Sequence, residues 1–222
     1  MFKGGVIMND NTVVVQIEGF SKKIKGNNIL TNINLDLYKG KIYGFVGHNG
    51  SGKSMLFKAI CGLTKGETGT ITVHGNILGE KVDFPERTGA LIEHPGFLQQ
   101  LSGFTNLKWL ASIQNKISNE QIINAIQLVG LDPNDKRAVK KYSLGMKQRL
   151  GIAQAIMENP DILILDEPMN GLDSQGVSSI RDLLLELKNK GVTILLASHI
   201  QEDIKLLCDE VFIMNNGEIV RG

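Results

Sequence analysis

The eight residues Gly47-His48-Asn49-Gly50-Ser51-Gly52-Lys53-Ser54 decide the fold of this chain. They match the pattern G-x-x-x-x-G-K-[ST] in full, between an expected strand at residues 41–46 and an expected helix. The glycines let backbone N–H groups converge on an anion, and the helix points its positive N-terminus at the same place. We expect all eight residues to bind a nucleoside triphosphate, with Lys53 near its β- and γ-phosphates and the Ser54 hydroxyl on Mg²⁺. The loop alone fits a kinase, a GTPase, a helicase-like ATPase and a transport ATPase.

Strand-like and helix-like segments alternate on both sides of this loop. Residues 13–17 are β-branched except for Gln16, and residues 33–37 alternate apolar and polar side chains. Residues 162–165 and 192–197 are short apolar runs, typical of parallel strands that are buried on both faces. The predicted fold class is therefore α/β: a P-loop NTPase core with a mainly parallel sheet, an N-terminal antiparallel β region and an inserted helical subdomain.

The predicted insert occupies residues 95–159 of a single domain that spans residues 1–222. Between Pro95 and Pro160 there is no β-rich run, and the apolar residues keep helical spacing. Phe104 and Trp109 lie in this insert, and we expect both to belong to its core rather than to a ligand platform.

The composition excludes several classes of protein. Of the 222 residues, 42% are hydrophobic and 21% are charged, so wholesale disorder is not expected. Lys and Arg number 24 against 23 Asp and Glu, and this balance does not favour nucleic acid as a partner. The two cysteines, Cys61 and Cys208, fit neither a disulfide framework nor a zinc site. The apolar runs are far shorter than the ~20 residues of a membrane-spanning helix.

Two adjacent acids follow the apolar run at residues 162–165. Ligands bind at the carboxyl ends of the strands in an open α/β sheet, and Asp166 and Glu167 are expected there. Asp166 is placed to hold Mg²⁺ through water, and Glu167 can orient or polarise an attacking water molecule. The second acid favours hydrolysis over transfer to a small acceptor, so a P-loop kinase is the less favoured alternative.

Three further motifs complete the pattern. Ser143-Leu144-Gly145 opens a helix upstream of the two acids, Asn170-Gly171-Leu172-Asp173 follows them, and Ala197-Ser198-His199 ends the next apolar strand. Taken alone, each has an ordinary structural explanation, such as a serine that caps a helix. In this order and together with the phosphate loop, they resemble an ATP-binding cassette (ABC) ATPase over residues 13–220.

The resemblance implies a head-to-tail pair of cassettes, either a homodimer or two paired subunits, that closes on ATP. Ser143 and Gly145 would contact the γ-phosphate of the ATP held by the opposite subunit, where a helix N-terminus favours an anion. Asp173 falls on the D-loop position, which crosses the interface. His199 falls on the switch histidine and, with Glu167, would be catalytic.

Three positions depart from the family pattern. Met146 replaces the glutamine that ends the signature motif. Ile24 aligns with the aromatic residue that stacks on adenine, so it can pack on the base but cannot stack. Glu93 aligns with the glutamine of the Q-loop and is a candidate Mg²⁺ ligand, because a carboxylate binds this ion better than an amide does. Glu93 and the signature variant resemble the bacitracin and lantibiotic self-protection exporters.

The resulting functional hypothesis is an ATP-hydrolysing subunit that drives a membrane ABC transporter, exporting a peptide antibiotic or a similar amphipathic compound. ATP and Mg²⁺ would be its cofactors, and a separate transmembrane permease its partner, without nucleic acid. It would lie in the cytoplasm, at the inner face of the cell membrane. A soluble ABC-type ATPase of an assembly or repair complex is the alternative within the same family.

Overall fold

The computed structural model describes residues 12–221, so residues 1–11 and 222 of the expected domain lie outside this description. One sheet is antiparallel and has the strand order β2-β1-β4-β5. Its strands are β1 (Val13–Ile24), β2 (Asn27–Tyr38), β4 (Thr68–Val73) and β5 (Asn76–Ile77). Because β1 pairs antiparallel with both β2 and β4, the predicted antiparallel β region is confirmed.

The second sheet has six strands in the order β10-β9-β3-β8-β7-β6. Its strands are β3 (Ile42–Val46), β6 (Thr88–Leu91), β7 (Ile162–Asp166), β8 (Thr193–Ala197), β9 (Glu210–Asn215) and β10 (Glu218–Arg221). From β9 to β6 all neighbours are parallel, whereas β10 pairs antiparallel with β9. This arrangement confirms the predicted mainly parallel sheet, and β9 and β10 form a C-terminal hairpin at its edge.

Strand β7 shows why the central strands are wholly apolar. Successive side chains of a strand point to opposite faces of the sheet. Ile162 and Ile164 join the hydrophobic core beneath the antiparallel sheet, whereas Leu163 and Leu165 join the core that extends into the helices on the other face. All four side chains are fully buried, so a polar residue at any of these positions would lose its water without gaining a partner.

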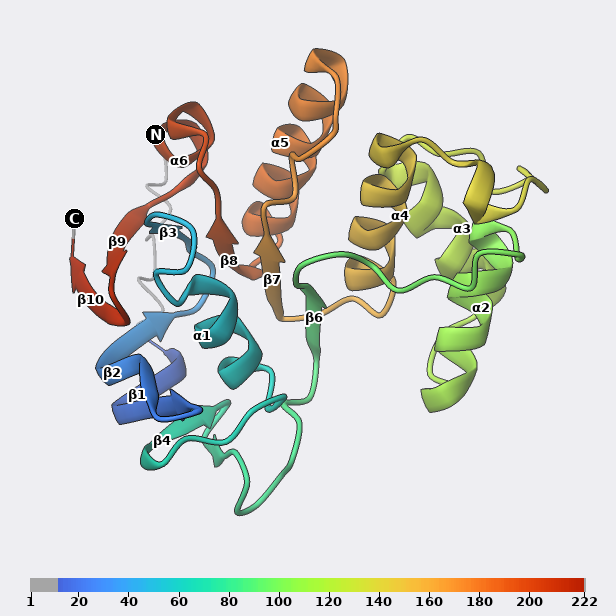
Figure 1. Ribbon diagram of the computed structural model, residues 1–222. Coiled ribbons are helices and arrows are strands. Elements are labelled where there is room, and N and C mark those ends of the chain that lie inside the picture. Colours follow the sequence, from blue (N-terminus) through green and yellow to red (C-terminus); the bar gives the residue numbers. More distant parts are fainter. Residues whose placement is uncertain (1–11, 222) are drawn as a thin grey trace, which may run out of the picture.

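Three of the helices follow one another along the chain, and the other three each lie between two strands. The helices are α1 (Lys53–Ile60), α2 (Gly103–Gln114), α3 (Asn119–Leu128), α4 (Leu144–Ile156), α5 (Ser174–Asn189) and α6 (Gln201–Leu207). In Figure 1, α2, α3 and α4 form a group beside β6, and the order β6-α2-α3-α4-β7 makes this group an insertion between two neighbouring strands. Every helix within residues 12–221 is too short or too polar to span a lipid bilayer.

Helix α2 corrects one prediction about the core. Trp109 is 63% exposed, so the expectation that it is a core residue was wrong. The buried face of α2 consists of Gly103, Asn106, Leu107 and Ala111, and this face directs Trp109 away from the core. Phe104 does pack against the core, as expected.

Candidate nucleotide site

The phosphate loop, residues 47–54, runs from the end of β3 into α1 with a backbone that needs its glycines. Gly52 caps α1 with φ 109° and ψ −3°, in the left-handed region that other residues avoid. A Cβ on Gly47 would lie 2.3 Å from the carbonyl oxygen of Met214 in β9. The loop is therefore confined between β9 and its own helix.

Two side chains inside the loop have the properties of a phosphate site. Lys53 is only 8% exposed, and its ammonium donates to the carbonyl oxygens of Gly47 at 2.7 Å and His48 at 3.2 Å. The Ser51 hydroxyl is buried and has no hydrogen-bond partner among the described residues. A buried polar atom without a partner is costly, and a phosphate oxygen would satisfy it. The residues present therefore fit a bound triphosphate.

Two of the three predicted Mg²⁺ ligands, Ser54 and Asp166, meet at the start of α1. Ser54 Oγ donates to Asp166 Oδ2, which lies at the end of β7 and is 6% exposed. Within residues 12–221, His, Cys, Asp and Glu side chains form no group of three that could hold a metal ion. One hydroxyl and one carboxylate nevertheless suit Mg²⁺, which keeps several waters and takes substrate phosphate oxygens as further ligands.

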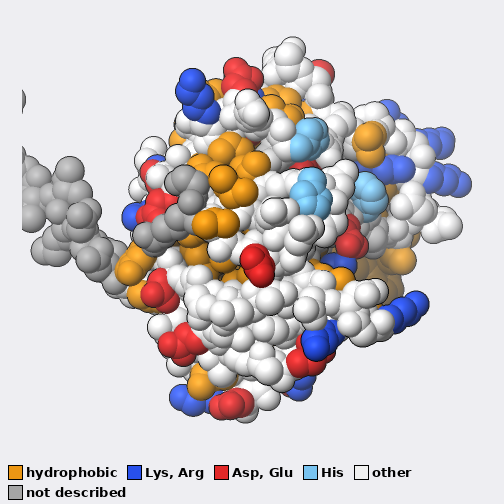
Figure 2. All heavy atoms as spheres, turned by 60° about the vertical axis from the view of Figure 1, so that its left-hand side comes forward, with side chains coloured by type: hydrophobic (Ala, Val, Ile, Leu, Met, Phe, Trp, Pro, Cys, Tyr) orange, Lys and Arg blue, Asp and Glu red, His pale blue; other side chains and the backbone are white. Residues whose placement is uncertain are grey.

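Glu167 and His199 form the second contact of the site. His199 Nδ1 lies 2.7 Å from Glu167 Oε2, and the His199 backbone N–H donates to the same oxygen at 3.3 Å. The parallel pairing of β7 with β8 places Asp166 opposite Ala197, which brings the two loops together. The side chain of Glu167 is 22% exposed and that of His199 is 63% exposed, so water reaches both. Figure 2 shows that histidine side chains gather on one face of the molecule, and His48, His94 and His199 are all exposed.

A buried ion pair supports the segment that carries His199. Asp203 of α6 is fully buried, and its carboxylate accepts hydrogen bonds from Arg181 of α5 at 2.8 Å and from the Ser198 hydroxyl at 3.2 Å. The Ser198 hydroxyl in turn accepts the Ile200 N–H at 3.1 Å. Hydrogen bonds to Glu202 and Asp203 raise the pKa of Arg181. The sequence did not reveal this support, because charges in a helix more often face solvent.

Ser143 and Gly145 lie at a different place, the start of α4. Ser143 caps this helix, since its hydroxyl accepts the Met146 N–H at 3.1 Å. Ser143, Gly145 and Asp173 line a cavity of about 480 Å³, which we call the signature cavity. It is lined by Gly130, Leu131, Asp132, Asp135, Arg137, Ser143, Gly145, Met146, Arg149, Gly171, Leu172 and Asp173. Among the described residues, none of the phosphate loop lines it, so the single chain does not join these two sets of predicted residues.

Close packing and paired charges shape the signature cavity. A Cβ on Gly145 would lie 2.7 Å from the carbonyl oxygen of Gly171, so the helix start sits directly against the segment before α5. Asp173 caps α5 by accepting the Gly176 N–H at 2.9 Å. Hydrogen bonds from Arg137 hold the pKa of Asp135 below its usual range, so both groups are charged and paired at neutral pH. These contacts leave the exposed Ser143 hydroxyl and the helix N-terminus open to an anion.

The structure does not test the roles predicted for Glu93 and Ile24. Glu93 Oε1 lies 2.6 Å from Lys58 Nζ of α1, so its carboxylate forms an ion pair at the rim of the site. Ile24 ends β1 and is 40% exposed, which leaves room for a base against it. Both roles stay predictions.

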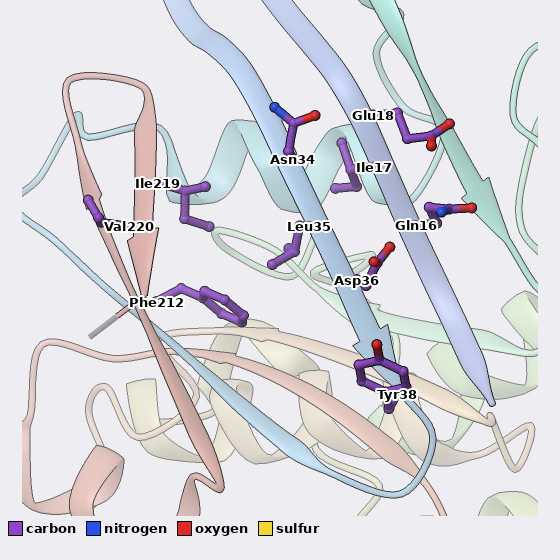
Figure 3. Close-up of a pocket in the computed structure, with 10 residues that line it drawn as sticks. All are labelled: Gln16, Ile17, Glu18, Asn34, Leu35, Asp36, Tyr38, Phe212, Ile219 and Val220. Carbon is purple, nitrogen blue, oxygen red and sulfur yellow. The ribbon is translucent and has the colours of Figure 1, made fainter. Parts of the chain in front are cut away.

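A separate cavity of about 520 Å³ lies between the antiparallel sheet and the C-terminal hairpin (Figure 3). Ile17, Leu35 and Phe212 supply apolar surface, and Glu18 and Asp36 supply negative charge. It contains neither a lysine nor a glycine-rich loop, so it does not suit a triphosphate.

Comparisons with protein families and with known proteins agree that this chain is similar to ATP-binding proteins of ABC transporters. The family model described as "ABC transporter" matches residues 30–170. The chain is 46% identical to an uncharacterized ABC transporter ATP-binding protein, YybJ, of Bacillus subtilis (strain 168), over 93% of this chain and 94% of the relative. It is 39% identical to the bacitracin transport ATP-binding protein BcrA of Enterococcus faecalis, covering 93% of this chain and 68% of the relative. It is 37% identical to the lantibiotic transport ATP-binding protein SrtF of Streptococcus pyogenes, covering 93% and 89%.

Solved structures share the fold. An ATP-binding subunit of an ABC transporter superimposes with a TM-score of 0.84 at 26% identity, covering 94% of this chain and 89% of the other. A dimeric ATP-binding cassette in a post-hydrolysis state, bound to ADP and Pi, superimposes with a TM-score of 0.84 at 21% identity, covering 93% and 97%. The predicted α/β cassette fold is therefore confirmed.

Proposed function

Because this chain belongs to the ABC transporter family as an ATP-binding subunit, we propose that its ATP hydrolysis drives export of a peptide antibiotic or a similar amphipathic compound through a separate membrane permease. One observation carries the hydrolytic part of this proposal. Ser54 meets Asp166, and Glu167 meets His199, at the carboxyl ends of two neighbouring parallel strands. These contacts support a site in which ion binding and water activation are neighbours.

Each residue of the site has a proposed task. Lys53 and the loop N–H groups hold the β- and γ-phosphates. Ser54 and Asp166 would hold Mg²⁺, which neutralises charge on the phosphates when bound. Glu167 accepts a hydrogen bond from the attacking water and directs its lone pair at the γ-phosphorus. His199, in contact with Glu167, fixes the direction of that carboxylate.

A second copy would complete the site. Ser143 and Gly145 face the signature cavity, away from the chain's own phosphate loop, and a helix N-terminus with an exposed hydroxyl suits the γ-phosphate of ATP on another subunit. We therefore assign them to an ATP shared by two head-to-tail copies, with Asp173 at the interface. The pair would act at the inner face of the cell membrane, bound to the permease.

The cargo follows from the relatives. BcrA is named for bacitracin transport and SrtF for lantibiotic transport, and the similarity to each covers 93% of this chain. We carry this class of cargo, a peptide antibiotic or a similar amphipathic compound, over to this chain.

Phosphate release from Mg·ATP tests the chemistry. We expect inorganic phosphate to accumulate without any added acceptor, whereas a P-loop kinase would leave ATP intact until an acceptor was supplied. Retrieval of the tagged chain from detergent-solubilised membranes tests the partner, and we expect a permease to accompany it. Recovery of soluble assembly factors instead would favour the alternative within the family.

Growth inhibition tests the cargo. Cells that carry the chain and its permease should grow at several-fold higher bacitracin or lantibiotic concentrations than cells that carry the Glu167→Gln variant. Glu120→Gln, a change at an exposed position in the first turn of α3, is the matched control and should protect fully. Equal sensitivity in all three strains would remove the antibiotic assignment but not the ATPase.

A further inference from the structure

Gln148 of α4 makes a contact that the proposed reaction does not yet use. Its side chain is 5% exposed, and its Nε2 donates to the backbone carbonyl oxygen of Glu167 at 3.0 Å. A buried amide must find partners within the protein, and here it finds the main chain of the residue that activates water. Gln148 is thus bonded to the catalytic segment although it belongs to the helix that begins at Ser143.

The backbone of Glu167 needs such support. Its φ is +52°, in the left-handed region that a residue with a side chain rarely adopts. Three hydrogen bonds hold it there. The Glu167 N–H donates to Ala197 O of β8 at 2.9 Å, and Glu167 O accepts both the Asn170 N–H at 3.2 Å and the Gln148 amide. Only the Gln148 bond comes from the helical insert, so it is the bond that changes when α4 moves relative to the sheet.

The position of Gln148 along α4 also connects this hydrogen bond to the signature cavity. Ser143 caps the same helix and lines the signature cavity, and Gln148 follows five residues later, roughly 7 Å along the axis at about 1.5 Å per residue. A rigid helix of this length transmits a shift at its start to its second turn. One end of α4 therefore faces the ATP assigned to a second copy, and Gln148 touches the Glu167 that acts on the chain's own ATP.

We propose that Gln148 is a positioning residue that couples the two ATP sites of the closed pair. Contact between the start of α4 and the partner's ATP sets the position of α4, and Gln148 then holds Glu167 in its productive backbone conformation. This inference rests on the proposed head-to-tail dimer. It goes further, because it names the group through which one ATP controls hydrolysis of the other.

The fold of α4 does not depend on this one side chain. Leu150, Ile152 and Ala153 of α4 are fully buried in the core shared with the central sheet. Replacing Gln148 with methionine keeps the length and flexibility of the side chain and removes the amide group, including the N–H that Glu167 O accepts. Gln154→Met, on the same helix and at a half-buried position, is the matched control.

The first test measures phosphate release against ATP concentration for wild type, Gln148→Met and Gln154→Met. We expect Gln148→Met to lower kcat about tenfold and to bring the Hill coefficient from near 2 to near 1, with ATP affinity within twofold of wild type. Gln154→Met should match wild type in all three. Unchanged kinetics in Gln148→Met, or a lower kcat with an unchanged Hill coefficient, would overturn the coupling. So would a wild-type Hill coefficient of 1.

A second test leaves Gln148 in place and so does not depend on that variant folding. Differently tagged copies are mixed so that one copy carries Glu167→Gln and the other keeps the active Glu167. Ser143→Asp is then added to the copy with the active Glu167. This change prevents α4 of that copy from contacting its partner's ATP. The site that still hydrolyses ATP keeps the unchanged Ser143 of the partner copy and is therefore complete. We expect at least a fivefold lower rate than in the pair without Ser143→Asp, and an equal rate would refute the inference. If the unmodified pair never forms on ATP, the proposed dimer itself fails, and the two failures are thus distinguishable.

Discussion

The carboxyl ends of the central strands and the start of α4 carry predicted ATP-binding residues in very different states. At the strand ends, Ser54 is bonded to Asp166, and Glu167 to His199. At the start of α4, the Ser143 hydroxyl bonds its own helix, and the rest of its surroundings is the signature cavity. One region is assembled by the chain itself, and the other presents half of a site.

This difference has a topological cause. Parallel neighbours β3, β8 and β7 bring their carboxyl ends to one edge of the sheet, so any ligand-binding residues placed there meet automatically. Helix α4 belongs to the insert between β6 and β7, and Ser143 and Gly145 at its start line the signature cavity, which no described phosphate-loop residue lines. The comparison predicts that changes in the assembled region act within one copy and that changes in the signature cavity act across two.

Removing the carboxylate of Glu167 should have the largest effect. We expect Glu167→Gln to lower the rate of phosphate release by at least about 100-fold, since general-base positioning contributes on the order of 10²–10⁴. ATP binding should persist, and size-exclusion chromatography with ATP should show a long-lived dimer. Glu120→Gln should behave as wild type. Hydrolysis that is undiminished in Glu167→Gln would remove this residue from the reaction.

A charge at the start of α4 should act across two copies. Ser143→Asp keeps the helix cap, because aspartate caps as well as serine does, but sets a negative charge against the γ-phosphate. We expect hydrolysis to fall by about 10–100-fold, equivalent to about 1.4–2.8 kcal/mol, with ATP binding to the separate monomer unchanged. Ser102→Asp, at the equivalent cap of α2, is the control and should leave hydrolysis at the wild-type level. Equal loss in both variants would mean that helix capping alone was disturbed.

An aromatic ring at position 24 should strengthen ATP binding in the assembled region. Stacking on a base is worth about 1–3 kcal/mol, so Ile24→Tyr should tighten ATP binding by about 5- to 150-fold if the base lies against this residue. Val13→Tyr, at the other end of β1 and similarly exposed at 38%, should change nothing. Equilibrium binding of a fluorescent ATP analogue measures both. Identical affinity in Ile24→Tyr and wild type would place the base elsewhere.

The smallest predicted effect concerns Cys61, which follows the helix that carries Lys53. Burial raises the pKa of the Cys61 thiol from 9.0 to about 12. A raised pKa means that the contribution to stability is intact below pH 9 and is lost as the pH rises toward 12. Between pH 8 and pH 10, the free energy of urea unfolding should therefore fall by about 1 kcal/mol more for wild type than for Cys61→Ala, which lacks the titrating group. Parallel losses in the two proteins would show that the thiol is not buried in solution.

Some features could be predicted because they depend on few neighbours. The phosphate loop is fixed by glycines and hydroxyls within eight residues, and the faces of β7 by simple alternation. The exposure of Trp109 could not be predicted. Helical spacing shows which apolar residues share one face of a helix, but it does not show which face the rest of the fold covers. The small residues Gly103 and Ala111 decided it, by letting that side of α2 approach the core.

By itself, then, the sequence determined the chemistry of this protein: a lysine and a serine at a helix start, and two acids at the end of an apolar strand. Their spacing is local, and local geometry follows from backbone sterics. Only the tertiary structure decided which groups support that chemistry. Gln148 reaches Glu167 across 19 positions of the chain, and Arg181 reaches Asp203 across 22. Such pairs form because packing removes water from both partners, and no sequence pattern records which buried groups will then face each other.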